Sequence, residues 1–366
     1  MHIFILAGEP SGDEYGASLM HELLDMDSNI KFSGIGGPLM ELQGLKSMQP
    51  LSKMSVMGFM EIFKTLPFFM KLEKKIIHYI LKNNPDKIIL IDYPGLNLRL
   101  CEKIKKQLNI EIVYYISPQV WAWKENRVKI IKQYVDKLIV IFKFEKKWYQ
   151  EKGLKAKYVG HPFLDIWNYD DTQMMQKDNV DLTKPILTLF PGSRTQEFKR
   201  HIDLMISAAL KVKEKIPDLQ ILLGLHQNIK YNKSIDSNIV VVKDAPLKAL
   251  AVSNAAIIAS GTATLQAAIM KVPSVVIYKM NALSWTLTKN IIKAPFASMA
   301  NIIAEEEVFP ELLQNQATKQ NLVQHTLNML TQNTYRTQLL DKIEIIKNKI
   351  GGPGASKRAA QYIMDN

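Results

Sequence analysis

The chain has 366 residues, 47% of them hydrophobic and 22% charged, which indicates a globular protein of about two domains and excludes collagen-like or broadly disordered classes. Lys and Arg number 47 against 35 Asp and Glu, which gives a net charge of +12. This charge favours an anionic partner such as nucleic acid, a phosphorylated ligand or an acidic membrane. The single cysteine, Cys101, excludes an intrachain disulfide and a thiolate cluster, and the seven His are scattered, so no metal site is expected.

Short strand-like runs alternate with helical patterns along the whole chain. The runs are β-branched and continuously apolar, as strands buried on both faces of a parallel sheet are. In the first half they are His2–Ala7, Lys31–Ile35, Lys87–Ile91, Ile110–Ile116, Lys137–Ile141 and Ala156–Val159. In the second half they are Pro185–Phe190, Leu219–Leu223, Asn238–Val242, Ala256–Ala259 and Pro273–Tyr278.

This alternation predicts an α/β chain with two Rossmann-like, doubly wound parallel-sheet domains. The domains are residues 1–168 and 169–350, joined by the polar interval 168–184, and a last helix in 351–366 either stays with the second domain or returns to the first. Because such sheets bind ligands at the carboxyl ends of their strands, the cleft between the domains is the expected active site. The chain opens directly on a strand and nowhere has 18 consecutive apolar residues, so neither secretion nor a membrane span is expected.

The loop Gly8–Gly16 follows the first strand and opens a helix. Its glycines allow backbone N–H groups to approach a ligand, and the helix start favours an anion or a hydroxyl-rich group. The loop matches neither dinucleotide nor P-loop spacing, which disfavours both sites. The alternative is an ordinary tight turn with Asp13 near the helix start.

An apolar segment, residues 54–70, adjoins a basic one. Phe59, Ile62, Phe63 and Leu66 share one face of a short helix that Pro67 is expected to end, and Met57, Met60, Phe68, Phe69 and Met70 widen this face. Residues 64–82 carry a net charge of +4, and residues 124–157 carry +7. The face is either part of a core or an interfacial segment suited to an anionic bilayer.

Asp92 ends an otherwise apolar strand in the sequence IDYPGLN. A carboxylate in such partly desolvated surroundings can have a raised pKa, which suits a general base that takes an alcohol proton. The alternative is a carboxylate that caps a helix or a turn.

Two further patterns are weaker. Asp25-Met26-Asp27 has the spacing of a metal-nucleotide motif but ends a helix pattern, which disfavours a metal role. The sequence SPQVWAW, residues 117–123, places aromatic residues beside basic ones, as base stacking would need, but no RNA-binding module accompanies it.

The second half has two small-residue turns between a strand and a helix. Phe190-Pro191-Gly192-Ser193-Arg194, followed by Glu197, joins such a turn to a fixed cation that can hold a diphosphate. Ala259–Thr264 presents hydroxyls and N–H groups at a helix start. These groups could simply cap the helix, but two such loops in one domain favour a nucleotide diphosphate.

Together these motifs resemble the lipid-A-disaccharide synthase family, glycosyltransferase family 19. The matching stretches are GEPSGDEYGA (8–17), MGFMEI (57–62), IDYPGLN (91–97), SPQVWAWKENRVKII (117–131), YVGHPFLD (158–165), FPGSR (190–194), ASGTATLQAA (259–268), NIIAEEEVFPELLQ (301–314) and GGPGAS (351–356). They occur in order and span nearly the whole chain.

The resemblance implies a GT-B fold with two Rossmann-like domains facing a central cleft. It also implies an inverting transfer from UDP-2,3-diacylglucosamine to 2,3-diacylglucosamine 1-phosphate, with Asp92 as general base. The residues expected on the acceptor side are Glu9, Ser11, Gly12, Asp13 and Asn97. The residues expected to bind UDP or serve the donor side are Gly192, Ser193, Arg194, Glu197, Ser260, Gly261, Thr262, Gln266, Asn301 and Gln314; Gln266 stands where the family usually has Glu.

The resemblance further implies contact of the apolar segment with membrane or acyl chains. The residues expected to make it are Val56, Met57, Phe59, Met60, Ile62, Phe63, Leu66, Phe68 and Phe69. The expected partners are the two acylated sugars and the anionic lipid of the inner membrane, on its cytoplasmic face, with no nucleic acid. No metal or other cofactor is expected.

Two other functions fit parts of the pattern. A UDP-sugar 2-epimerase shares the two-domain architecture but gives no reason for an apolar segment beside basic residues. A basic nucleic-acid-binding protein is favoured only by the net charge.

Overall fold

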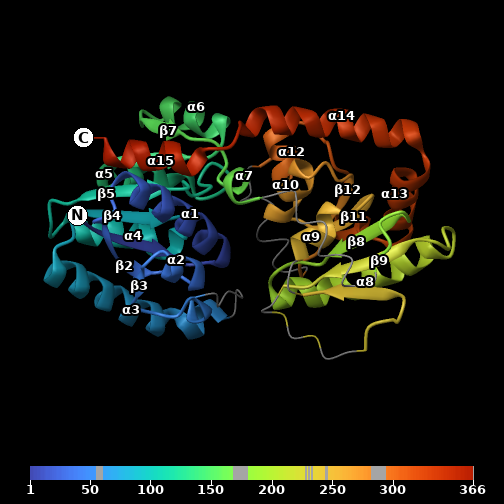
Figure 1. The fold of residues 1–366 in the computed structure, drawn as a ribbon, viewed down its shortest axis with the longest axis horizontal. Coiled ribbons are helices and arrows are strands. Elements are labelled where there is room, and N and C mark those ends of the chain that lie inside the picture. The colour runs from blue at the N-terminus through green and yellow to red at the C-terminus, as the bar shows by residue number, and fades with distance from the viewer. Residues whose placement is uncertain are drawn as a thin grey trace. The chain divides into compact units, whose positions relative to one another are not determined.

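The computed structural model describes residues 1–54, 61–167, 180–226, 229, 231, 234–243, 246–281 and 294–365, with the backbone alone at residue 52 and residues 61–65. The chain divides into two compact units, which are described separately. The first comprises Met1–Trp167 with Ile350–Asn366, and the second comprises Asn168–Lys349. Figure 1 shows that each unit is a sheet with helices packed against it.

The first unit is built on a parallel sheet with the strand order β3-β2-β1-β4-β5-β6-β7. Its strands are β1 His2–Ala7, β2 Lys31–Ile35, β3 Lys46–Ser47, β4 Lys87–Ile91, β5 Glu111–Tyr115, β6 Lys137–Val140 and β7 Ala156–Tyr158. Its helices are α1 Pro10–Met26, α2 Pro38–Leu42, α3 Glu61–Asn83, α4 Pro94–Lys105, α5 Val128–Tyr134, α6 Lys143–Glu151, α7 Phe163–Ile166 and α15 Ala355–Met364, with short 3-10 turns at Leu51–Lys53 and Glu125–Arg127.

The second unit has a parallel sheet with the order β10-β9-β8-β11-β12-β13. Its strands are β8 Ile186–Phe190, β9 Gln220–Gly224, β10 Ile239–Val242, β11 Ala255–Ala259, β12 Ser274–Tyr278 and β13 Glu311–Leu313. Its helices are α8 Thr195–Lys213, α9 Pro246–Ala251, α10 Thr262–Ile269, α12 Met299–Ala304, α13 Lys319–Thr331 and α14 Asn333–Ile350, with a 3-10 turn at Gln314–Gln316.

The prediction of two parallel-sheet α/β domains is confirmed, and each predicted strand is present with its bounds moved by at most a few residues. Two edge strands were not predicted. Lys46–Ser47 and Glu311–Leu313 are two and three residues long and contain charged side chains, so they lack the apolar run that marks the central strands.

The prediction that Pro67 ends a helix is wrong. Helix α3 runs through Pro67 and continues to Asn83. Proline lacks the N–H that would bond to the carbonyl one turn earlier, but the later turns of α3 bury Leu72, Ile76 and Ile80 in the core of the first unit. This burial outweighs the single lost hydrogen bond.

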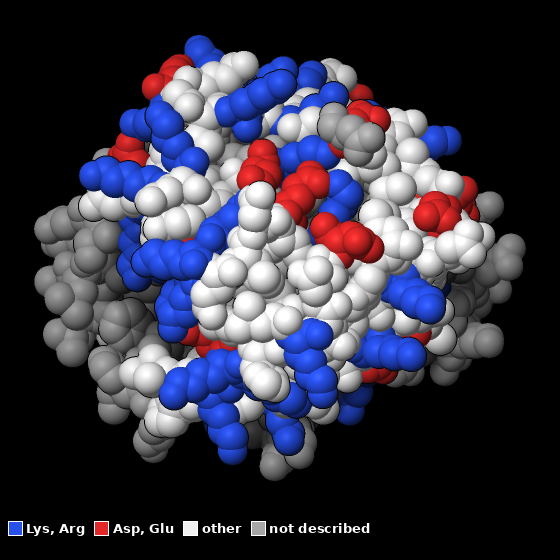
Figure 2. Space-filling model, turned by 90° about the vertical axis from the view of Figure 1, so that its left-hand side faces the viewer, with Lys and Arg blue, Asp and Glu red and all other residues white. Residues whose placement is uncertain are grey.

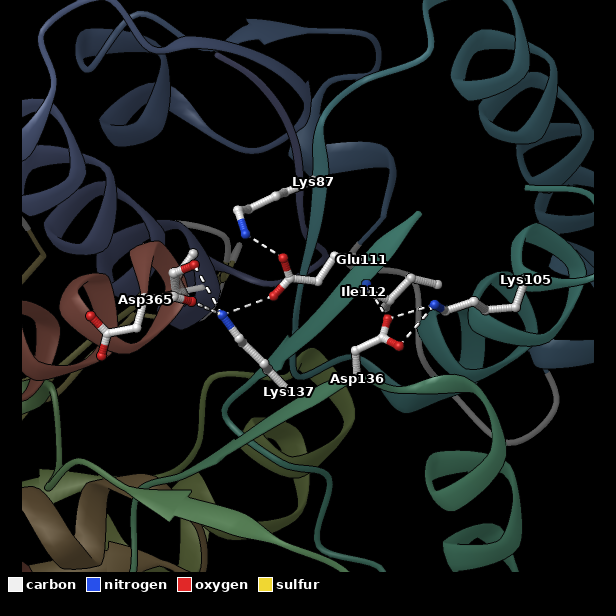
Figure 3. Close-up of polar contacts among 8 residues, drawn as sticks. Lys87, Lys105, Glu111, Ile112, Asp136, Lys137 and Asp365 are labelled. Atoms are coloured by element: carbon white, nitrogen blue, oxygen red, sulfur yellow. Dashed lines mark hydrogen bonds and ion pairs between the residues drawn. The ribbon is translucent and has the colours of Figure 1, made fainter. Parts of the chain in front are cut away.

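The last helix, α15, belongs to the first unit and is held at both ends. At its start, the Asp165 carboxylate accepts hydrogen bonds from the N–H groups of Gly354, Ala355 and Ser356 at 2.5, 3.2 and 2.7 Å. At its end, Figure 3 shows Lys137 donating to the Asp365 carbonyl and pairing with Glu111, which also pairs with Lys87. The second unit therefore lies between two segments of the first along the chain.

Candidate active site

The two loops that follow β1 and β4 lie next to each other, because these strands are neighbours in the sheet. The ring of Tyr93 occupies the space beside Gly8, where an added Cβ would lie 2.4 Å from it. Only glycine fits at position 8. This packing holds Glu9, on the first loop, close enough for its charge to act on Asp92, on the second.

Asp92 and Tyr93 both have left-handed backbone conformations, with φ values of 44° and 47°. Such conformations cost non-glycine residues about 1 kcal/mol or more each and occur mostly where surrounding contacts enforce them. Here the Asp92 carbonyl accepts hydrogen bonds from the Tyr114 hydroxyl at 2.6 Å and the Asn97 amide at 2.8 Å. The Tyr93 hydroxyl donates to the carbonyl of Met54 at 3.0 Å. The strained turn is therefore held from several sides and fixes the position of the Asp92 carboxyl group.

The Asp92 carboxyl is poised to accept a proton near neutral pH. Burial and, to a smaller extent, the negative charge of Glu9 raise the pKa of Asp92 against an opposing hydrogen bond from the N–H of Tyr93, and the resulting pKa is about 7. A general base works best when its pKa lies close to the working pH. The position and the electrostatics agree with the role predicted from the sequence.

Asp13 has a different place from the one expected. Its carboxylate is buried and accepts hydrogen bonds from the N–H groups of Gly37, Leu39 and Met40 at 2.8, 3.1 and 3.0 Å. These bonds cap α2 and tie the end of β2 to α1. We therefore assign Asp13 to holding the loops together, in place of the predicted contact with an acceptor.

Replacing Asp13 with Asn is expected to destabilise the protein by about 2 kcal/mol, because an amide cannot accept from all three N–H groups and its own NH₂ faces donors. Urea unfolding would measure this loss. Glu9→Gln is the matched control on the same loop and should unfold as the parent does. Equal stability of the Asp13→Asn variant would contradict the structural assignment.

Asn97, also expected on the acceptor side, is fully buried beneath the Asp92 turn. Its amide donates to the carbonyls of Ile91 and Asp92 at 3.2 and 2.8 Å. It therefore positions the base. Ser11 and Gly12 lie in the first turn of α1, as expected, where Ser11 is half-buried.

The buried residue Glu145 was not predicted as part of this site. It accepts hydrogen bonds from the indole N–H of Trp121 at 3.1 Å and from the N–H groups of Ile141 and Phe142 at 3.3 and 3.2 Å. Burial raises the pKa of Glu145 to about 8 against these hydrogen bonds, and the charge of Asp92 also raises it. Glu145 joins the loop after β5 to the loop after β6. The sequence offers only a glutamate in a basic helix, which does not reveal this contact.

In the second unit, the loops after β8, β11, β12 and β13 lie at the carboxyl edge of adjacent strands. Gly192 has φ 116°, a conformation that favours glycine, and Arg194 pairs with Glu197 at 3.3 Å. Ser193 and Arg194 are exposed at this edge. The loop thus presents a fixed cation where the sequence predicted one.

The loop after β11 is fixed by a side-chain hydrogen bond on one side and has open space beside its glycine. The Ser260 hydroxyl donates to the carbonyl of Ala297 at 2.5 Å, and no atom of the described residues lies within 4 Å of a Cβ added at Gly261. Thr262 is exposed at the start of α10, and Gln266 is half-buried one turn later. The backbone of this loop is accessible to an anionic group.

His201 was likewise not predicted, because isolated histidines carry no pattern. It is buried, and its Nε2 accepts from the N–H of Lys279 at 3.0 Å, which makes Nδ1 the donor to the carbonyl of Pro191 at 3.0 Å. Burial lowers its pKa. The ring therefore stays neutral and joins the loop after β8 to the end of β12.

Asn301 and Gln314, both expected to bind the donor, hold the backbone together. The Asn301 amide donates to the carbonyl of Phe309 and the carboxylate of Glu311, both at 2.8 Å, and accepts from the N–H groups of Val308 and Phe309. With its amide oriented to satisfy both groups, Gln314 pairs with the backbone of Met280 at 3.2 and 3.3 Å. We assign Asn301 to shaping this edge, because its hydrogen-bonding capacity is used.

The predicted membrane-contact residues are only partly within the described chain. Val56, Met57, Phe59 and Met60 lie outside it, and only the backbone of Ile62 and Phe63 is described. Leu66 and Met70 are 46% and 54% exposed, whereas Phe68 and Phe69 pack against the core. The ring of Phe69 lies 6.4 Å from that of Tyr93, so this end of α3 adjoins the Asp92 turn.

Within the described ranges, no three His, Cys, Asp or Glu side chains are grouped as metal ligands would be. Among the same residues, no helix has both the length and the apolarity that crossing a bilayer requires.

Comparison with known proteins identifies relatives along nearly the whole chain. Residues 3–363 match the family described as Lipid-A-disaccharide synthetase. The lipid-A-disaccharide synthase of Coxiella burnetii is 34% identical, with 99% of this chain and 97% of the relative covered. That of Nitrosococcus oceani is 36% identical, with 99% and 95% covered.

Among solved structures, the fold is similar to UDP-GlcNAc 2-epimerase of Neisseria meningitidis, solved with UDP-GlcNAc bound, with a TM-score of 0.72, 13% identity and 100% of both chains covered. It is also similar to the calicheamicin glycosyltransferase CalG4, with a TM-score of 0.60, 14% identity and 99% and 97% covered. The predicted GT-B fold, which glycosyltransferases and epimerases of this kind share, is therefore confirmed.

Proposed function

Because the chain belongs to the lipid-A-disaccharide synthase family of glycosyltransferases, we propose that it joins UDP-2,3-diacylglucosamine to 2,3-diacylglucosamine 1-phosphate, forming a β-1,6-linked disaccharide 1-phosphate and releasing UDP. The observation that carries the proposal is that the similarity covers residues 3–363 and so includes both the Asp92 turn and the loops of the second unit. The substrates follow from the family.

The proposed reaction is a single inverting displacement. Asp92 takes the proton of the acceptor's 6-hydroxyl as this oxygen attacks the anomeric carbon of the donor, and UDP leaves from the opposite face. The raised pKa of Asp92 supports this role, because a carboxylate with a pKa of about 7 is a stronger base than an ordinary aspartate. Glu9 and Ser11 would contact the acceptor, whereas Gly12 is buried against Ala7 and Ile91.

The donor side of the proposal rests on the second unit. Negative charge develops on the leaving diphosphate, and Arg194 with the N–H groups at the starts of α8 and α10 would stabilise it. Gly192, Ser193, Ser260, Gly261 and Thr262 leave this backbone accessible, and Gln266 can offer its amide to the nucleoside, whereas the Gln314 amide already pairs with the backbone of Met280. No step needs a metal, so activity should survive EDTA.

Release of UDP tests the proposal. Purified protein given both acylated sugars should release UDP, and omitting either one should stop the release. UDP-GlcNAc supplied alone tests the other activity found on this fold, in the epimerase of Neisseria meningitidis. Formation of UDP-N-acetylmannosamine without a requirement for an acceptor would reject the transferase.

We also propose that the protein binds the cytoplasmic face of the inner membrane peripherally through α3 and the residues before it. Leu66 and Met70 expose apolar surface, and Lys71 and Lys74 are exposed beside them. Lys and Arg side chains cover much of the face of the molecule shown in Figure 2. Because Phe69 packs near Tyr93, a lipid bound at this end of α3 would lie close to the Asp92 turn.

Replacing Leu66 and Met70 together by Ser should weaken binding to phosphatidylglycerol vesicles about tenfold or more, since each apolar side chain is worth about 1 kcal/mol or more when buried in lipid. Vesicle sedimentation measures the binding. Leu42→Ser is the control, because Leu42 is an apolar residue on α2 of the same unit whose side chain is 80% exposed. Unchanged sedimentation of the double variant would contradict the proposed contact.

A further inference from the structure

Two cations of the first unit lie on one aromatic ring. The Lys124 ammonium is 4.5 Å from the centroid of the Trp123 ring, and the Arg127 guanidinium is 5.5 Å from it. Glu125, between them in sequence, pairs with Lys152 at 2.5 Å. In the part of the chain that the structure describes, no Asp or Glu forms an ion pair with Lys124 or Arg127.

The charges around this pair are mostly positive. Burial and the charge of Arg127 lower the pKa of Lys124. Burial also lowers the pKa of Arg127. The positive charge of Arg99 lowers this pKa as well, and Tyr114 raises it. Arg99 itself pairs with Glu73 at 2.7 Å, and Glu73 also pairs with Lys103. An anion placed between Lys124 and Arg127 would relieve this repulsion.

The cation pair lies one side chain away from the proposed base. Arg127 lies near the neutral Tyr114, whose hydroxyl donates to the carbonyl of Asp92 at 2.6 Å. Trp123 is 44% exposed, so a ligand can reach the ring and its cations. Lys124 and Arg127 follow β5, which is the parallel neighbour of β4, so their loop and the Asp92 turn lie at the same edge of the sheet.

We propose that Lys124 and Arg127 bind the 1-phosphate of the acceptor sugar, with the Trp123 ring holding both cations in place. This inference rests on the proposed function. In the acceptor, the phosphate on C1 and the 6-hydroxyl on the carbon attached to C5 flank the ring oxygen, so a phosphate site must lie close to the base. The planar fork of Arg127 suits two hydrogen bonds to phosphate oxygens, and Lys124 adds a point charge.

The preference for the phosphorylated acceptor measures this contact directly. The probes are 2,3-diacylglucosamine 1-phosphate and the same sugar without phosphate, each with saturating donor. The parent protein should have a higher kcat/KM for the phosphorylated acceptor. Arg127→Gln should lower that kcat/KM about 10- to 100-fold, as expected for loss of hydrogen bonds to a charged group, and change the value for the unphosphorylated sugar little.

Lys129→Gln is the matched control, since Lys129 is an exposed cation on the adjacent helix α5, and it should behave as the parent does. Arg127→Lys should have a kcat/KM for the phosphorylated acceptor between those of the parent and Arg127→Gln, because lysine keeps the positive charge but lacks the planar guanidinium that makes two parallel hydrogen bonds. The KM for the donor should not change in any variant. A combined Lys124→Gln and Arg127→Gln variant should lose the preference altogether.

Three results would overturn the inference. An equal loss with both acceptors would mean that Arg127 only supports the fold. A preference that survives in the combined variant would mean that the phosphate binds elsewhere. Loss of phosphatidylglycerol vesicle binding with the preference intact would assign the cations to a lipid headgroup. Failure of the parent protein to make disaccharide from either acceptor would reject the proposed function itself.

Discussion

Replacing Asp92 with Asn should lower kcat by about 10² to 10⁴, the usual contribution of a general base. The amide keeps the shape of the side chain but cannot take the proton of the attacking hydroxyl. In the parent protein, kcat/KM should rise with pH through the pKa of about 7 and level off above it, because only the ionised carboxylate is a base. The variant should lack this rise. Product formation followed between pH 5 and 9 measures both effects.

The stability of the Asp92→Asn variant separates lost chemistry from lost folding. The pKa of Asp92 is about 7 in the folded protein against an ordinary value of 3.8, so the parent protein loses stability as the pH rises from about 4 to about 7 and keeps the full loss at higher pH. The variant avoids this loss and should be at least as stable as the parent at pH 8. Asp25→Asn, which removes an exposed carboxylate of the D-x-D pattern, should leave activity unchanged. Near-parental turnover of the Asp92→Asn variant would contradict the assignment.

Replacing Arg194 with Gln should lower kcat by about 10²- to 10³-fold, the effect of removing one group that stabilises developing charge in a transition state. Arg194 is the cation that the loop after β8 presents, held at 3.3 Å from Glu197. Steady-state kinetics with varied donor measure the change, and a larger effect on kcat than on the donor KM would show that the contact strengthens as UDP leaves.

Lys199→Gln is the control for Arg194, because Lys199 is an exposed cation one turn further along α8. It should retain parental kinetics. If Arg194→Gln affects the donor KM alone, then Arg194 binds the donor without stabilising the departing diphosphate. If it affects neither, the loop after β8 is not the diphosphate site.

The sheet arrangement could be predicted because the central strands are buried on both faces and therefore apolar along their length. The edge strands Lys46–Ser47 and Glu311–Leu313 lack this pattern. The prediction from Pro67 was wrong because the free-energy cost of a proline inside a helix is smaller than the free energy gained by burying the following turns of α3. Local rules failed where packing of distant residues decided the structure.

The candidate site could be located from polar residues that end apolar strands, but the role of each residue could not. Asp92 directly follows β4 and Asp13 lies in the first turn of α1 after β1, and the Asp13 carboxylate accepts three backbone N–H groups of another loop. Asn301 looked like a ligand contact and is satisfied within the fold. His201 and Glu145 act through contacts with residues distant in sequence, which no spacing reveals.

The net charge of the chain does not by itself locate a binding surface. The first unit has 26 basic against 19 acidic residues and the second has 21 against 16, so both are positive. Charge therefore does not identify which unit meets a membrane. The membrane proposal depends on the exposed apolar side chains of α3. The phosphate-site proposal depends on Lys124 and Arg127, which lie over the Trp123 ring and form no ion pair with an Asp or Glu among the described residues.

Mass spectrometry and NMR of the product test the central claim most directly. Purified protein supplied with UDP-2,3-diacylglucosamine and 2,3-diacylglucosamine 1-phosphate should give one tetra-acylated disaccharide 1-phosphate, with a β linkage from C1 of the donor sugar to the acceptor's O6 and one UDP per disaccharide. An α linkage would contradict the single inverting displacement. UDP release with free 2,3-diacylglucosamine and no disaccharide would contradict the transferase itself.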